Sequence, residues 1–152
     1  MPVGILSATF VTAHTGKVEG VSNVRVMIVD DQAPFRDAAR AVVERAKEFE
    51  LVGEAESGEQ AVEVADALRP DLILMDINMA GITGIEATSR ITTAHPEITV
   101  FLLSTYNVDD LPPDVRTCGA SAYINKENFG GRLLRTTWES GGEAGWRVRT
   151  PA

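Results

Sequence analysis

The sequence predicts an α/β protein built around a doubly wound, five-stranded parallel sheet. From residue 24 onward, five apolar segments of strand length alternate with segments that have the apolar spacing of helices. Parallel strands require such crossovers, and a sheet covered on both faces has strands that are apolar throughout. A chain of 152 residues is the right size for one domain of this kind.

The five strands and the first two helices are well marked in the sequence. The five expected strands are VRVMIV (24–29), ELVGEA (50–55), DLILMD (71–76), ITVFLLS (98–104) and ASAYIN (120–125). Pro34 suits the first turn of a helix that places Phe35 on its inner face. Ser57 followed by Gln60 reads as a capping box that opens the second helix, and Pro70 ends that helix before the third strand.

The later helices are less regular. A third helix from about Gly84 to Ala94 shows apolar or small residues at threefold spacing. Pro112 and Pro113 predict that the fourth helix is short and begins at Pro113. The last helix is expected from about Glu127 to Ser140, with two glycines weakening its first turn.

The predicted domain organisation follows from where this periodicity starts and stops. Residues 1–22 have no clear period, and we expect a disordered N-terminal extension. The folded domain is predicted over 23–140, followed by a flexible, glycine-rich tail over 141–152.

Composition limits the partners and the compartment. Lys plus Arg number 14 against 22 Asp plus Glu, so the formal charge of −8 argues against direct nucleic-acid binding. The N-terminus lacks a cationic signal-peptide region, no apolar run approaches a membrane span of about 20 residues, and Cys118 is the single cysteine. We therefore expect a cytoplasmic protein with no membrane contact.

Polar residues gather where the predicted strands end. Asp30 and Asp31 follow the first strand, Asp76 ends the third, Ser104 ends the fourth and Lys126 follows the fifth. The carboxyl ends of parallel strands share one edge of the sheet, where ligands bind. Adjacent carboxylates repel unless a cation compensates them, and Mg²⁺ prefers such oxygen ligands together with a phosphate. The pattern predicts a Mg²⁺-dependent phosphoryl-transfer site, with Lys126 and Ser104 contacting phosphate oxygens.

The motifs VDD, LMDINM, LLST and YINK, in this order at successive strand ends, resemble the receiver domain of bacterial two-component response regulators. The resemblance implies a (βα)5 flavodoxin-like receiver fold with strand order 2-1-3-4-5. It implies a non-enzymatic signalling domain that takes a phosphoryl group from a phosphohistidine of a sensor histidine kinase. The receiver would then signal to an unknown downstream protein through altered contacts, and a homodimer stays open.

The resemblance also assigns roles to individual residues. Asp76 would be the phospho-acceptor, and the Mg²⁺ ligands would be Asp30, Asp31, Asp76 and the backbone carbonyl of Asn78. The chain departs from the family at Ala80, where a proline is usual, so the loop after Asp76 is expected to be less rigid.

Lys126 and Ser104 would contact the phosphoryl group, and Ser104 with Tyr123 would form the switch pair. Tyr106, a bulky residue two positions after Ser104, is hypothesised to shield the acyl phosphate from water.

Three alternatives stay open. The first is a pseudo-receiver that binds partners without phosphorylation. The second is a phosphatase of the haloacid-dehalogenase type, although the segment Asp30-Asp31-Gln32 does not match its D-x-D motif. The third, a nucleotide-binding fold, is disfavoured because neither GxGxxG nor GxxxxGK occurs. We expect a stand-alone receiver whose sequence resembles receivers of regulators with helix-turn-helix output domains.

Overall fold

A computed structural model describes residues 23–142 and shows the predicted sheet. Its strands are β1 (Val24–Val29), β2 (Phe49–Ala55), β3 (Leu72–Asp76), β4 (Thr99–Ser104) and β5 (Ala122–Asn125). All neighbours are parallel, and the order is β2-β1-β3-β4-β5, which confirms the predicted fold. The prediction for residues 1–22, and most of that for the tail, lie outside the described residues.

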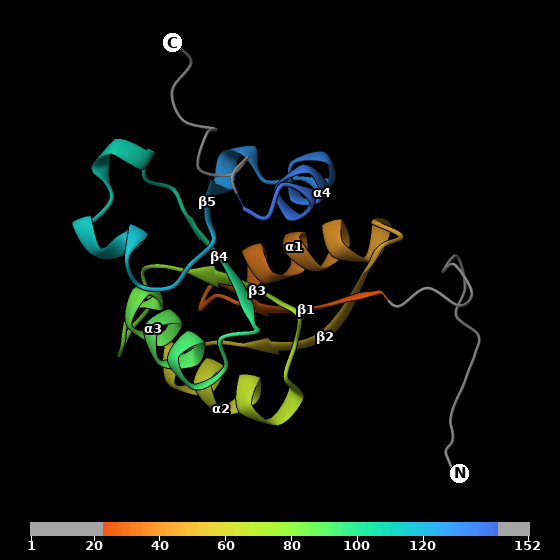
Figure 1. Ribbon diagram of the computed structural model, residues 1–152. Coiled ribbons are helices and arrows are strands. Elements are labelled where there is room, and N and C mark those ends of the chain that lie inside the picture. Colours follow the sequence, from red (N-terminus) through yellow and green to blue (C-terminus); the bar gives the residue numbers. More distant parts are fainter. Residues whose placement is uncertain (1–22, 143–152) are drawn as a thin grey trace.

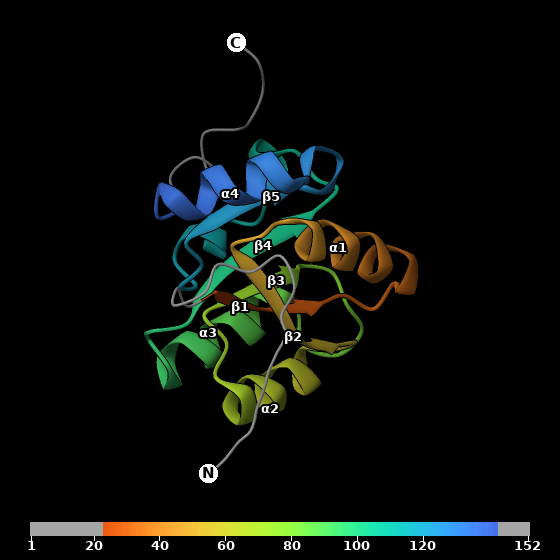
Figure 2. The same ribbon diagram turned by 90° about the vertical axis from the view of Figure 1, so that its right-hand side faces the viewer.

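Two layers of helices enclose the sheet. Helices α1 (Ala33–Arg45) and α4 (Gly131–Glu139) cover one face, and α2 (Gly58–Leu68) and α3 (Gly84–Ala94) cover the other (Figures 1 and 2). Each face has its own apolar core. On the α2/α3 face, Met27, Ile73 and Leu102 pack with Ala61, Ala65 and Ile91. On the α1/α4 face, Ile28, Leu74 and Phe101 pack with Ala39, Val43 and Leu134.

The connection between β4 and β5 differs from the other strand connections of the fold, because it contains no α-helix. Two short 3₁₀ turns, η1 (Val108–Asp110) and η2 (Pro113–Arg116), stand there in place of an α-helix. The turn η2 confirms the prediction of a short helical segment beginning at Pro113. The physical reason is that proline cannot continue a helix that starts before it.

The predicted start of the last helix is wrong. Lys126–Asn128 forms a separate 3₁₀ turn, η3, and α4 begins only at Gly131. The Asn125 side chain caps this turn by accepting from the Glu127 amide at 2.8 Å, and Phe129 and Gly130 are extended. The capped turn and the extended Phe129 and Gly130 therefore interrupt the helix that apolar periodicity alone predicts.

No helix within residues 23–142 is both long enough and apolar enough to cross a bilayer.

Gly84 lets α3 start directly against the end of β3. Its amide donates to the carbonyl of Ile77 at 2.8 Å. A Cβ atom at this position would lie 1.9 Å from the backbone oxygen of Asp76, which is far inside van der Waals contact. A residue without a side chain is therefore required beside the strand end that carries Asp76.

Replacing Gly84 with alanine should destabilise the fold by about 2 kcal/mol or more, since the backbone must move to relieve the overlap. Chemical denaturation measures the change. Gly131→Ala is the matched control, because a Cβ atom there meets nothing within 4 Å at the start of α4. Equal stability of the two variants would contradict the prediction.

Candidate functional site

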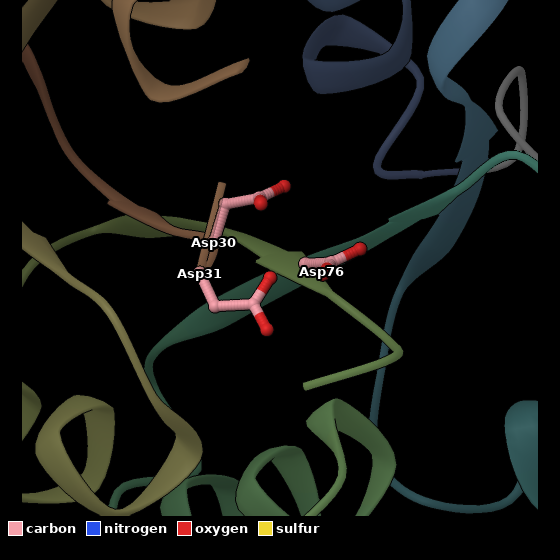
Figure 3. A group of neighbouring side chains, drawn as sticks. All are labelled: Asp30, Asp31 and Asp76. Atoms are coloured by element: carbon pink, nitrogen blue, oxygen red, sulfur yellow. The ribbon is translucent and has the colours of Figure 1, made fainter. Parts of the chain in front are cut away.

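Three aspartates meet at the carboxyl edge of the sheet (Figure 3). Asp30 follows β1 and Asp76 ends β3, and these strands are neighbours with Val29 opposite Met75. One carboxylate oxygen from each of Asp30, Asp31 and Asp76 lies within 4.8 Å of the others. Asp30 is 0% exposed and Asp76 5% exposed, whereas Asp31 faces solvent. The strand topology has thus brought the predicted acidic residues into one group.

Lys126 supplies the cation that neighbouring carboxylates require. Its Nζ atom lies 2.7 Å from Oδ2 of Asp30 and 3.1 Å from Oδ1 of Asp76, and its side chain is 15% exposed. Burial alone would lower the pKa of Lys126, but the hydrogen bonds and charges of Asp30 and Asp76 outweigh it and raise this pKa. The ammonium is therefore charged at neutral pH.

One ammonium does not fully compensate three carboxylates. Burial is the largest cause that raises the pKa of Asp76, and the negative charge of Asp30 is the second. Together they raise this pKa to about 6 despite the opposing effect of Lys126. The ligand atoms of the group are all carboxylate oxygens, which suit a hard divalent cation such as Mg²⁺. The oxygen ligands and the negative charge that Lys126 leaves uncompensated both fit the predicted Mg²⁺.

The backbone orients Asp30 within the group. The Gln32 amide donates to Asp30 Oδ1 at 2.8 Å, while Lys126 donates to the second oxygen, Oδ2. The buried carboxylate is therefore fixed by one neutral and one charged donor.

Ser104 and Tyr123 lie together on β4 and β5. Ser104 is buried, and its Oγ atom accepts from the Tyr106 amide at 3.0 Å. The buried Tyr123 hydroxyl donates to the Ser104 carbonyl at 3.0 Å and also to the Tyr106 carbonyl. Burial raises the pKa of Tyr123 to about 12, so the phenol stays protonated and remains a donor. The predicted pair is in contact, although its role as a switch stays a prediction.

The loop after Asp76 contains Asn78, which is exposed. Its role as a metal ligand through the backbone carbonyl also stays a prediction. The loop carries Ala80 at the position where a proline is usual in the family. A hydrogen bond restrains this loop, since Glu59 on α2 accepts from the Ile82 amide at 3.1 Å. Gly81, with φ of 84°, adopts the left-handed conformation that this tight turn requires.

Two contacts of the site escaped prediction from the sequence. The Lys126 ammonium lies 4.5 Å from the ring centroid of Phe35 on α1, a cation–π contact. Asn125 donates through Nδ2 to the Tyr106 carbonyl at 3.0 Å while its Oδ1 atom accepts from the Glu127 amide. The sequence gives one signal for Asn125, its position directly before Lys126, whereas helical spacing predicts only that Phe35 lies on the inner face of its helix.

The raised pKa of Asp76 predicts a pH-dependent stability. The folded state holds this proton up to about pH 6, whereas the ordinary value is 3.8, so the contribution of Asp76 to stability falls as pH rises between these values. In the absence of divalent ions, Asp76→Asn should therefore be more stable than the parent at pH 7, by roughly 1 to 3 kcal/mol.

Urea unfolding of both proteins at several pH values between 4 and 7.5 measures this difference. It should shrink as the pH falls toward 4, because Asp76 is then protonated in the folded state. A difference that is constant across this range would contradict the assigned cause.

Comparison with known proteins agrees with this geometry. A family model described as the response regulator receiver domain matches residues 26–137. The transcriptional regulatory protein DegU of Brevibacillus brevis is 37% identical over 106 residues, which are 70% of this chain and 45% of that protein. The chain spans about half the length of the curated relatives it matches.

Solved structures agree as well. A two-component response regulator of the LuxR family from Aurantimonas sp. SI85-9A1 superposes with a TM-score of 0.71 at 27% identity, covering 78% of this chain and 84% of that one. The signal receiver domain of the putative response regulator NarL from Mycobacterium tuberculosis gives a TM-score of 0.71 at 25% identity, covering 80% and 98%. The chain belongs to the response regulator receiver domain family of two-component systems.

Proposed function

We propose that this receiver accepts a phosphoryl group on Asp76 from a phosphohistidine of a sensor histidine kinase, in a Mg²⁺-dependent reaction. The observation that carries the proposal is the buried Asp76 carboxylate, which contacts Lys126 and lies within one group with Asp30 and Asp31. The downstream effect is a change in contacts with another protein, and the domain acts in the cytoplasm.

The chemistry requires an ionised nucleophile. A carboxylate oxygen of Asp76 attacks phosphorus, a P–O bond forms, and the P–N bond breaks with its electron pair going to the imidazole nitrogen. With a pKa of about 6, Asp76 is mostly ionised at neutral pH. Lys126, which already contacts Asp76, then turns its ammonium to a phosphoryl oxygen. Asp30, Asp31, Asp76 and the Asn78 carbonyl would hold Mg²⁺, which would supply positive charge to neutralise the phosphoryl oxygens.

The switch is proposed to start at Ser104. Its hydroxyl accepts from the Tyr106 amide and keeps its own proton free to donate to a phosphoryl oxygen. Movement of Ser104 would disturb the hydrogen bonds from Tyr123 to the carbonyls of Ser104 and Tyr106. New negative charge at Asp76 thereby acts on the segment that follows β4.

The pseudo-receiver alternative is less well supported. A domain that binds partners without phosphorylation has no need to keep a buried carboxylate with a raised pKa beside a buried ammonium, which is costly to maintain.

Incubation with acetyl phosphate and Mg²⁺ should add one phosphoryl group, measured as an increment in intact-protein mass. Omission of Mg²⁺ or the Asp76→Asn substitution should abolish the increment. An unmodified mass under every condition would favour the pseudo-receiver, and an increment that persists in Asp76→Asn would place the acceptor elsewhere.

Tyr106 should slow hydrolysis of the acyl phosphate. It is 43% exposed, and its amide is hydrogen-bonded to Ser104, so its backbone lies next to the site and its side chain is partly open to solvent. Tyr106→Ala should lose the phosphoryl group several-fold faster, whereas Tyr106→Phe keeps the ring and should behave like the parent. Phosphoryl loss is followed by mass over time, and an unchanged rate in Tyr106→Ala would remove the idea.

A further inference from the structure

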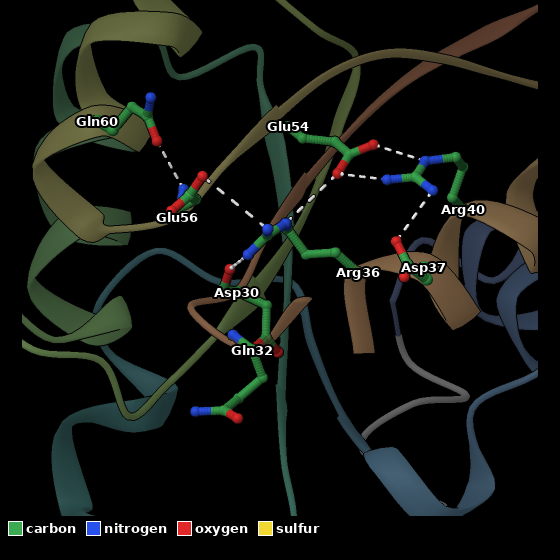
Figure 4. A network of polar contacts seen from close by, with 8 residues as sticks. All are labelled: Asp30, Gln32, Arg36, Asp37, Arg40, Glu54, Glu56 and Gln60. Atoms are coloured by element: carbon green, nitrogen blue, oxygen red, sulfur yellow. Dashed lines mark hydrogen bonds and ion pairs between the residues drawn. The ribbon is translucent and has the colours of Figure 1, made fainter. Parts of the chain in front are cut away.

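The guanidinium of Arg36 lies beside Asp30, between α1 and the end of β2 (Figure 4). Its Nη1 atom donates to the backbone carbonyl of Asp30 at 2.7 Å. Its Nε atom lies 3.5 Å from Glu54 and its Nη2 atom 3.9 Å from Glu56, and the side chain is 15% exposed. Arg36 therefore ties three parts of the chain together: the first turn of α1, the turn after β1 and the end of β2.

The carbonyl that accepts from Arg36 belongs to the peptide that joins Asp30 to Asp31. A change in ψ at Asp30 would move this carbonyl oxygen and turn the Asp31 side chain relative to that of Asp30. The Gln32 amide fixes the Asp30 side chain, and Arg36 fixes the backbone from which both aspartates project. Because the guanidinium donates to a backbone oxygen here, it restrains the turn without occupying a carboxylate oxygen of the metal site.

We propose that Arg36 is a positioning residue for the metal site, holding the Asp30–Asp31 peptide in the orientation that presents both carboxylates to Mg²⁺. The proposal rests on the proposed function, since it assumes that the acidic group binds Mg²⁺. It extends that function by naming a residue that acts on the metal through the backbone rather than by contact.

Charge and positioning predict opposite effects on metal affinity. Arg36 is a cation close to an acidic group, so removing its charge alone would make Mg²⁺ bind more tightly. Removing the hydrogen bond that fixes the Asp30–Asp31 peptide would make Mg²⁺ bind more weakly. The sign of the change therefore separates the two roles.

Arg40 provides a matched control. It lies one turn further along α1 and donates to both carboxylate oxygens of Glu54, at 2.8 and 3.1 Å. It also forms an ion pair with Asp37 at 3.1 Å. Arg36→Met and Arg40→Met each remove one α1 cation that pairs with Glu54, but only the first removes a contact with Asp30.

The experiment is a calorimetric Mg²⁺ titration of the full chain and both variants, with unfolding midpoints measured in parallel. Arg36→Met should weaken Mg²⁺ binding about tenfold, and Arg40→Met should leave it within about twofold. Arg36→Lys keeps a donor and a charge and should recover part of the loss; it also replaces Arg36→Met if that variant does not fold. Arg36 variants that bind as tightly as Arg40→Met, or more tightly, would overturn the proposal.

The parent protein separates this test from that of the proposed function. If the parent binds Mg²⁺ and accepts a phosphoryl group while Arg36→Met binds Mg²⁺ normally, only the role of Arg36 is wrong. If the parent binds no Mg²⁺, the metal site itself is wrong and the role of Arg36 falls with it.

Discussion

The ion pairs of Lys126 with Asp30 and Asp76 are the interaction on which the site depends. They join the turn after β5 to the ends of β1 and β3, across the intervening strand β4. Two buried carboxylates side by side would otherwise cost several kcal/mol of desolvation and repulsion. The ammonium makes their burial tolerable and leaves a net negative charge, which is the condition for attracting a divalent cation. Strand topology places the acids side by side, and Lys126 lets them be buried there in ionised form.

Much of this arrangement could be predicted from the sequence. The five strands are apolar throughout because both sheet faces are covered, and that pattern is visible without a structure. Since parallel strands end at one edge, Asp30, Asp76 and Lys126 could be placed together from their positions alone. The short segment after β4 was likewise visible, because Pro112 and Pro113 restrict the backbone whatever the tertiary context.

Two of the contacts that escaped prediction share a physical cause. Arg36 and Asn125 both donate to backbone carbonyls, of Asp30 and Tyr106, and a carbonyl oxygen carries no residue-type signal. The start of α4 was misplaced for a related reason. Apolar periodicity continued through Phe129, but the side-chain cap from Asn125 and the extended backbone at Gly130 decide where the helix begins. Local hydrogen bonding has overridden periodicity there.

The replacement of a helix by the turns η1 and η2 bears on how a signal would leave the site. Each turn is closed by few backbone hydrogen bonds, so rearranging this segment breaks little regular structure. A coupling free energy of about 1 to 3 kcal/mol can then change its population of conformers substantially. A helix in the same place would move as a rigid cylinder and present a fixed surface in two positions. A partner that reads the proposed signal at this segment would instead distinguish two arrangements of a pair of short turns.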